Sequence, residues 1–352
     1  MTDESSTVSH LPGDRTTTDE TAITHGDMNS LSSRDAKFYF GCAVVAIGVV
    51  GTAANALILY AMVASKQHKK QLLIFNQNAL DLFSSVFTVI TYSLKLSNIY
   101  LTGFSGYFLC ALVLTDNLIW WGIGGSMISL AAISVERYVK VKHPLWSKKK
   151  LFKRLKYSAA AFSWIASIMY MSVLVFSTSA VIDGGCYPYE LFVTDIARVI
   201  HLLFDFCFFY IFIILLCIFC YWRILIVIRR QARIMAAHSA GAHGSRTGQP
   251  QAAVANQIQT NVIKTVIIVS AFYAVSFLPF YTHALLANLS PTVVPSGSSH
   301  YLTMFATFLY TCTNPFIYAT NFNPVRKILL DKLSCQKIFP EQATENVANN
   351  PT

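Results

Sequence analysis

The sequence predicts an all-α membrane protein folded as a bundle of seven transmembrane helices. The composition is 54% hydrophobic and only 12% charged, and the mean hydropathy of +0.48 is higher than a water-soluble domain usually has. Apolar windows of about 20 residues are what a helix needs to cross the hydrocarbon layer. Each must be helical, because lipid cannot satisfy backbone N–H and C=O groups. Seven windows occur, at 38–64, 73–94, 107–135, 157–180, 199–228, 265–287 and 300–320.

The first three spans each contain polar residues that are costly in a membrane and therefore informative. Asn55 in the first span is a short amide of the kind that bridges helices. Asp81, in the middle of the second span, is either a hydrogen-bonded carboxylate that holds helices together or an ion or proton site. The third span ends in SVERYVKVKHP, where Glu136 and Arg137 are neighbours.

The remaining four spans add basic flanks and two prolines. The fourth follows the basic run SKKKLFKRLK, which we expect to meet anionic lipid headgroups, and the fifth ends in CYWRIL. Pro279 in the sixth span and Pro315 in the seventh each remove an intrahelical hydrogen bond. Each proline therefore predicts a bend, which is either a hinge or merely a kink.

The basic residues predict the orientation of the chain. With the N-terminus outside, 22 of the 27 Lys and Arg residues fall in the inner segments and 5 outside, as expected for cytoplasmic loops. No cleavable signal peptide is recognisable, so the first span is expected to direct insertion. We therefore expect a multi-pass plasma-membrane protein with an extracellular N-terminus and a cytoplasmic C-terminus. The net charge of +10 is then a property of the inner face and does not indicate a nucleic-acid partner.

Several motifs occur together on the expected helices. Glu136, Arg137 and Tyr138 form ERY at the inner end of the third span, and Pro144 and Leu145 follow. NPFIY runs from Asn314 to Tyr318 in the seventh span. With Asn55, Asp81, Trp164 and Pro279 in their spans, this set resembles the rhodopsin-like (class A) family of G-protein-coupled receptors over about residues 38–335.

The resemblance implies a domain organisation. It divides the chain into a disordered extracellular tail (1–36), a seven-transmembrane receptor domain (37–335) and a disordered cytoplasmic tail (336–352). The segment NFNPVRKILLDKLSC resembles the short amphipathic helix eight of the family. Its last residue, Cys335, is a candidate for palmitoylation or a plain thiol.

The resemblance also implies an activation switch and a heterotrimeric G protein as partner. In the family's off state the acid neutralises the neighbouring arginine, and on activation the sixth helix swings outward and frees it. The alternative is an arginine that snorkels to the headgroups beside a fortuitous glutamate. The residues that would carry coupling and activation are Glu136, Arg137, Tyr138, Pro144, Leu145, Tyr221, Asn314, Pro315 and Tyr318. Tyr221 and Tyr318 could instead be interfacial anchors.

Cysteines give a second implication of the resemblance. Cys110 at the outer end of the third span and Cys186 in the loop DGGCYPYE are expected to form a disulfide, as in the family. Cys110 lies 27 positions before Arg137, two more than is usual there.

Polar and aromatic residues in the outer half predict a ligand site. Asp116 with Trp120, His201 with Asp205, and Phe277 with Tyr281 are each four apart, so each pair shares a helix face. The predicted ligand-binding residues are Asp116, Trp120, His201, Asp205, Phe277, Tyr281 and His283. Ordinary packing is the alternative for single aromatics. The buried acids need partners, and because no Lys or Arg lies deep in the spans, we expect a cationic ligand.

The class of ligand follows from position and charge. A gapless count back from Arg137 reaches Ile119 where the family's amine receptors keep their Asp, and Asp116 lies one turn further out. Acids outside the membrane, such as Asp183, Glu190 and Asp195, would attract a basic peptide. We therefore expect a peptide receptor of the neuropeptide type, with an amine as second choice. An opsin is disfavoured, because the seventh span has no lysine for a retinal Schiff base.

Some family positions are changed. Phe277 replaces the tryptophan of the sixth helix, and the fifth span has no proline. No cofactor is expected. The sodium pocket of the family is matched by Asp81, Ser126 and Asn314, but Tyr310 fills a position that is usually small.

Two other classes of function remain open. A seven-helix ligand scavenger would share the fold without G-protein signalling, and a transporter would show paired halves, which are not evident. An enzyme is not expected, because no nucleophile with a base, metal set or phosphate loop is recognisable.

Overall fold

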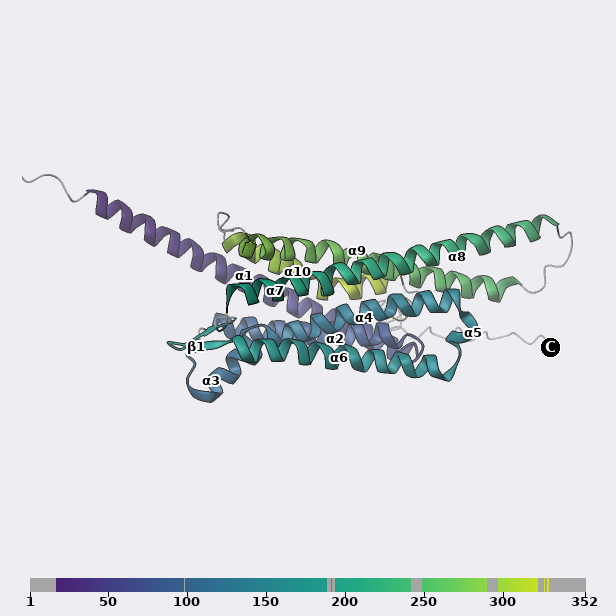
Figure 1. The fold of residues 1–352 in the computed structure, drawn as a ribbon, viewed down its shortest axis with the longest axis horizontal. Coiled ribbons are helices and arrows are strands. Elements are labelled where there is room, and N and C mark those ends of the chain that lie inside the picture. The colour runs from purple at the N-terminus through teal and green to yellow at the C-terminus, as the bar shows by residue number, and fades with distance from the viewer. Residues whose placement is uncertain are drawn as a thin grey trace, which may run out of the picture.

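The computed structural model describes residues 17–97, 99–188, 191, 194–241, 249–289, 297–321, 326 and 328. Long helices lie side by side along one axis and form a single bundle (Figure 1). They are α1 (Thr17–Ala64), α2 (Leu72–Leu96), α4 (Asn117–Lys142), α6 (Lys150–Thr178), α8 (Ile213–Gly241), α9 (Gln249–Leu289) and α10 (Gly297–Asn321). Shorter elements are α3 (Gly103–Leu109), η1 (Cys110–Leu114), α5 (Pro144–Ser147), β1 (Ala180–Ile182), β2 (Gly185–Tyr187), α7 (Asp195–Asp205) and η2 (Phe206–Phe212).

Most of these helices are long and apolar enough to cross a membrane. Within the described ranges six stretches meet that condition, namely Asp35–Ala64, Leu72–Leu96, Gly103–Lys142, Lys150–Thr178, Asp195–Gln231 and Ile263–Leu289. The 25-residue α10 packs between α1 and α9 and completes the bundle. The predicted all-α bundle of seven helices is thus confirmed, with ends a few residues from those expected from hydropathy.

The first helix is longer than the sequence indicates. It begins at Thr17, inside the segment expected to be a disordered tail. The added part contains no proline, the residue that most strongly interrupts a helix. The division of the chain into two tails and a receptor domain stays a prediction.

The third span is interrupted near its outer end. The π-helix η1 (Cys110–Leu114) is followed by Asp116 in the left-handed conformation, with φ of 62°, before α4 begins. Aspartate is one of the few residues other than glycine that tolerate this conformation. The wide turn and the break absorb the extra residues between Cys110 and Arg137, which a continuous helix could not.

The fifth span has a similar irregularity. It consists of α7, the π-helix η2 (Phe206–Phe212) and α8. Without a proline to bend this helix, the π-helical turn changes its direction and the register of its side chains.

A hairpin covers the outer end of the bundle. Strands β1 and β2 pair antiparallel with Val181 opposite Cys186, and the predicted disulfide joins Cys110 to Cys186 with Cα atoms 5.4 Å apart. Gly184 at the turn has a φ of 76°, and a Cβ there would lie 2.0 Å from the Tyr100 ring. Only glycine fits, and the hairpin is fixed over the third span.

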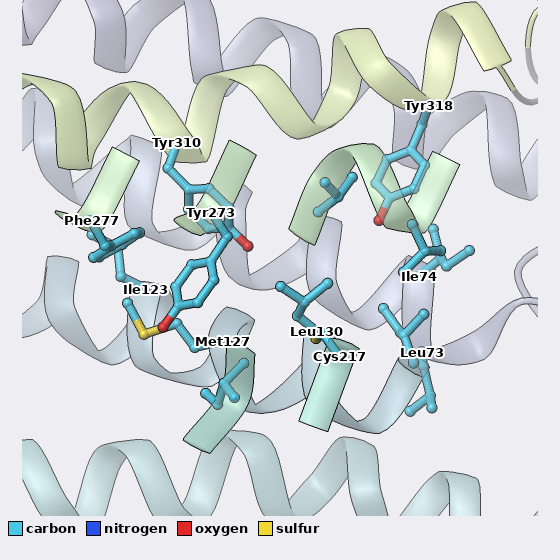
Figure 2. Close-up of a cluster of buried hydrophobic side chains, with 14 of the residues drawn as sticks. Leu73, Ile74, Ile123, Met127, Leu130, Cys217, Tyr273, Phe277, Tyr310 and Tyr318 are labelled. Carbon is cyan, nitrogen blue, oxygen red and sulfur yellow. The ribbon is translucent and has the colours of Figure 1, made fainter. Parts of the chain in front are cut away.

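The core lies between α2, α4, α9 and α10. Figure 2 shows aromatic rings from α9 and α10 facing aliphatic side chains of α2 and α4, with Tyr273, Phe277 and Tyr310 grouped together. All three side chains are fully buried. Close packing of this kind holds membrane helices together, because lipid provides no hydrophobic drive for their association.

Candidate functional site

The inner end of the bundle contains a buried cluster of charges. Glu136 and Arg137 have side chains only 2% and 5% exposed, and an Arg137 Nη2 lies 3.6 Å from a Glu136 oxygen. The same carboxylate is 2.7 Å from Lys140 Nζ and 3.3 Å from Lys156 Nζ. The acid therefore faces three cations, and its nearest partner is Lys140, one helical turn along α4.

A second restraint on Arg137 comes from outside α4. Its Nη2 donates a short hydrogen bond to the side-chain oxygen of Gln71, the residue that precedes α2. The expected pairing of Arg137 with Glu136 is thus present, and each partner has further contacts. An uncharged amide also holds the arginine, and two lysines also approach the carboxylate.

The other predicted inner residues differ in burial. Tyr138 accepts a hydrogen bond from Lys142 Nζ at 2.8 Å near the surface. Pro144 begins α5, and Leu145 is 80% exposed. Leu145 therefore presents an apolar side chain outside the bundle, where a partner could contact it.

Both predicted tyrosines point into the bundle. The hydroxyl groups of Tyr221 and Ser134 are 2.9 Å apart, joining α8 to α4. Tyr318 donates to the side-chain oxygen of Gln77 at 2.9 Å, and Gln77 Nε2 donates to Tyr310 at 3.2 Å. These tyrosines are structural links between helices rather than interfacial anchors.

The buried polar residues near the middle of the bundle also link helices. Asn314 donates to Asp81 Oδ2 at 2.8 Å, which joins α10 to α2. Asn55 donates to the Thr311 carbonyl at 3.0 Å and so joins α1 to α10. Ser126 is fully buried in the same region and adjoins Asp81. Tyr310 fills the neighbouring space as its size predicts, and the sodium site stays a prediction.

A cavity of about 330 Å³ opens in the outer half of the bundle. Its wall is mainly apolar and includes the aromatic and methionine side chains of Trp120, Phe280 and Met304. Five of the seven predicted ligand-binding residues line it, namely Asp116, Trp120, His201, Asp205 and Tyr281. A mainly apolar cavity with few polar groups is typical of a ligand pocket.

The acids in this cavity already have partners, which corrects the argument for a cationic ligand. Lys95 Nζ lies 2.7 and 2.8 Å from the two Asp116 oxygens. We expected Lys95 outside the helices, but it is in the last turn of α2, where its side chain reaches across to the break before α4. Lys95 lies one residue beyond the predicted second span (73–94), so hydropathy does not count it among residues inside the membrane.

Asp205 is also satisfied within the protein. The Tyr170 hydroxyl donates to Asp205 Oδ1 and lies 2.9 Å from His201 Nε2, while His201 Nδ1 is 3.4 Å from Asp205 Oδ2. Tyr170 comes from α6, so this group ties α6 to α7. Sequence spacing indicated the His201–Asp205 pair, whereas nothing in the sequence singled out Tyr170.

Two predicted ligand residues do not line the cavity. Phe277 is fully buried below it against Tyr273 and Tyr310, because it lies a turn deeper than Tyr281. His283 packs against His300, with ring centroids 5.5 Å apart, because two residues of helix turn it away from Tyr281. His300 does line the cavity and was missed. Cys335 and helix eight, apart from Arg326 and Ile328, lie outside the described residues.

Comparison with known proteins places these features in a family. The family model described as 7 transmembrane receptor (rhodopsin family) matches residues 54–318. Melanopsin of Phodopus sungorus is 25% identical over 318 residues, covering 85% of this chain and 63% of the relative. Rhodopsin of Sepia officinalis is 21% identical over 332 residues, covering 89% and 68%. The chain thus spans less than two thirds of that melanopsin. The crystal structure of squid rhodopsin superposes with a TM-score of 0.68 at 19% identity, covering 84% of this chain and 85% of that one.

Proposed function

The chain belongs to the rhodopsin family of seven-transmembrane receptors, and from this premise we propose that it binds an extracellular ligand in the outer cavity and activates a heterotrimeric G protein. Activation proceeds by outward movement of α9, the sixth transmembrane helix. The observation that carries the proposal is Arg137, a cation that is 4% exposed at the inner end of the bundle and is restrained by side chains that can release it.

Release of Arg137 is energetically feasible. A single hydrogen bond to Gln71 and a carboxylate shared with two lysines restrain it. A hydrogen bond to a charged group contributes about 1.5–3 kcal/mol, and binding of a partner protein readily offsets that amount. Pro279 inside α9 leaves one carbonyl of that helix without its usual donor, which favours bending there.

The ligand that these features favour is a basic peptide, with an amine second. Asp183 and Asp195 are exposed around the outer end and would attract positive charge. A cavity of about 330 Å³ admits a side chain or two rather than a whole peptide. The Lys95–Asp116 pair is 27% and 12% exposed, so a cationic side chain that enters can compete with Lys95 for the carboxylate.

A light-absorbing function is not proposed, although melanopsin and rhodopsin are relatives. The helix α10 contains no lysine. Phe308, at the position where the lysine would be expected, is 1% exposed and packs against Tyr92.

The test is reconstitution of signalling. Purified receptor in lipid nanodiscs is mixed with several G proteins and labelled nucleotide, with and without pools of basic peptides and amines. We expect at least one peptide to stimulate nucleotide exchange. Arg137→Ala should abolish that stimulation while peptide binding and expression stay near wild type.

The matched control is Lys142→Ala. Lys142 is an exposed cation at the same end of α4, and its ammonium group contacts the Tyr138 side chain. Its replacement should leave exchange close to wild type. Peptide accumulation without exchange in any G protein would instead indicate a scavenger, and full exchange by Arg137→Ala would remove the proposed role of the arginine.

A further inference from the structure

A second hollow, larger than the ligand cavity, lies between α8 and α9. It has a volume of about 630 Å³. We call it the α8–α9 groove, and its walls are Ile214, Cys217, Ile218, Tyr221, Trp222, Leu225, Ile226 and Arg229 of α8 with Ile267, Ser270, Ala271, Tyr273 and Ala274 of α9. The two helices run antiparallel beside each other in the bundle (Figure 1).

The groove faces the membrane. Its α8 wall follows a helical repeat of three and four residues, so one face of that helix lines it. Trp222 and Ile218 on that wall are 66% and 54% exposed, which places apolar side chains at the lipid boundary. Apart from Tyr221, none of the groove residues is among those proposed to carry coupling and activation.

The floor of the groove is buried and partly polar. Cys217 and Tyr221 of α8 are 3% and 7% exposed, and Ser270 of α9 adjoins both. Further out, Tyr210 donates to the Ala274 carbonyl at 2.9 Å and Tyr273 donates to that of Phe209. These bonds tie η2, which leads directly into α8, to α9 at the outer limit of the groove.

The groove has the length and end group that a phospholipid needs. From Ile214 to Arg229 a helix rises about 22 Å, which exceeds the roughly 15 Å of one hydrocarbon leaflet. Arg229 forms the end towards the Arg137 side, where Arg230 and Arg233 follow. A guanidinium binds phosphate oxygens through paired hydrogen bonds.

We propose that the α8–α9 groove binds an anionic phospholipid of the inner leaflet, with an acyl chain along the apolar wall and the phosphate at Arg229. The positive charge of Arg229 complements the negative charge of the lipid phosphate, which favours an anionic phospholipid over other occupants. A neighbouring transmembrane helix would need small residues on both sides for close approach. The α9 side offers Ser270, Ala271 and Ala274, but the α8 side presents the bulky Ile218, Trp222, Leu225 and Ile226 and ends in a charge at Arg229.

The site adjoins the residues of the proposed switch. The acyl chain rests on Tyr221, whose hydroxyl is bonded to Ser134, about one turn before Arg137 on α4. A lipid that binds one arrangement of α8 and α9 better than another therefore shifts the balance between them. Lipid composition of the inner leaflet becomes a regulator of the receptor.

The experiment is photolabelling of the full chain in nanodiscs of neutral phosphatidylcholine. A trace of phosphatidylglycerol or phosphatidylcholine with a diazirine in one acyl chain is added and activated, and labelled peptides are mapped by mass spectrometry. Phosphatidylglycerol should label the groove segments of α8 and α9 preferentially. Loss of one arginine near the membrane surface should lower that labelling by about fivefold.

Two matched pairs of variants make the test specific. Arg229→Ala should reduce phosphatidylglycerol labelling, whereas Arg230→Ala, with the same loss of charge outside the groove, should not. Ala271→Phe should fill the groove and block labelling, whereas Ile268→Phe, exposed on another face of α9, should not. Each variant is shown to be folded by a solubility and a melting temperature close to those of the wild-type receptor.

Three outcomes would overturn the proposal. Labelling spread evenly over lipid-facing helices, equal labelling by the neutral lipid, or unchanged labelling in both Arg229→Ala and Ala271→Phe would each exclude the site. Neither ligand nor G protein is present in this experiment. Its failure is therefore distinguishable from failure of the proposed function.

Discussion

The two ends of the bundle both contain ion pairs between helices or turns, but they differ in burial. At the outer end Lys95 and Asp116 form one pair whose side chains are 27% and 12% exposed. At the inner end Glu136 is 2% exposed and meets Arg137, Lys140 and Lys156 together. Both members of the outer pair can be reached from solvent, whereas at the inner end Glu136 and Arg137 are buried and only the lysines, at 26% and 13%, reach it.

Because of this difference, a ligand can separate the outer pair, whereas the inner cluster can hold the receptor in one conformation. An ion pair near solvent contributes between about 0 and 1 kcal/mol, so a ligand can replace one partner at small expense. Removal of one partner from a buried pair destabilises by about 3–5 kcal/mol, because the remaining charge loses its compensation. The inner cluster is therefore the element with enough energy to keep the receptor in one state.

The largest effect is expected from removal of the buried acid. Glu136→Gln leaves Arg137, Lys140 and Lys156 facing one another without a carboxylate. We expect a loss of stability of about 3–5 kcal/mol, seen as a lower melting temperature in detergent, together with raised basal nucleotide exchange. Asp195→Asn is the control, because it removes an exposed acid with a side chain 90% exposed. Equal melting temperatures for the two variants would contradict the comparison.

The sequence predicted the inner end better than the outer end for a physical reason. ERY and NPFIY are short contiguous motifs, so Glu136, Arg137, Asn314 and Tyr318 are recognisable without any knowledge of packing. Gln71 is 66 positions from Arg137. The contact between them depends on the relative depth of α2 and α4, which hydropathy does not determine.

The outer end depends on backbone irregularities that hydropathy does not reveal. The π-helix η1 and the left-handed Asp116 direct that carboxylate towards Lys95. Spacing along an ideal helix correctly predicted that Asp116 and Trp120 both face the cavity. It did not predict how deep these residues lie or which side chains they contact. For the same reason Phe277, predicted to face the ligand, lies in the core.

The second largest effect is expected at Gln71. Gln71→Ala removes the amide that accepts from Arg137, a bond to a charged group that contributes about 1.5–3 kcal/mol. If this bond exists only in the off state, basal nucleotide exchange should rise by about tenfold or more. Stability should fall less than in Glu136→Gln.

Gln67→Ala is the matched control for that variant. Gln67 has the same side chain and lies four residues before Gln71, in the turn that leads to α2. The Arg137 guanidinium donates to Gln71 and not to Gln67. Gln67→Ala should leave basal exchange unchanged. A Gln71→Ala receptor with wild-type basal exchange would show that the carboxylate alone restrains the arginine, as the motif had indicated.

A smaller effect is expected at the outer pair. In a double-mutant cycle, Lys95→Ala and Asp116→Ala should show a coupling of about 0.2–1 kcal/mol in stability. The same cycle on Lys140 and Glu136 should give a clearly larger value, measured as shifts in melting temperature. Because Lys95 and Lys140 are almost equally exposed, at 27% and 26%, coupling of equal size would mean that the deeper burial of Glu136 than of Asp116 does not strengthen its ion pair.

The smallest effect is expected at Arg198, which pairs with Asp195 at the start of α7 while both side chains are largely exposed, at 47% and 90%. Arg198→Ala should leave stability within about 0.5 kcal/mol of wild type, as for most surface substitutions. Thr194→Ala, four residues earlier, should cost about 1 kcal/mol, because the Thr194 hydroxyl caps the helix by accepting from the Ala197 N–H at 3.1 Å. If Arg198→Ala destabilised the receptor as much as Glu136→Gln, burial would not be what distinguishes the charges at the two ends of the bundle.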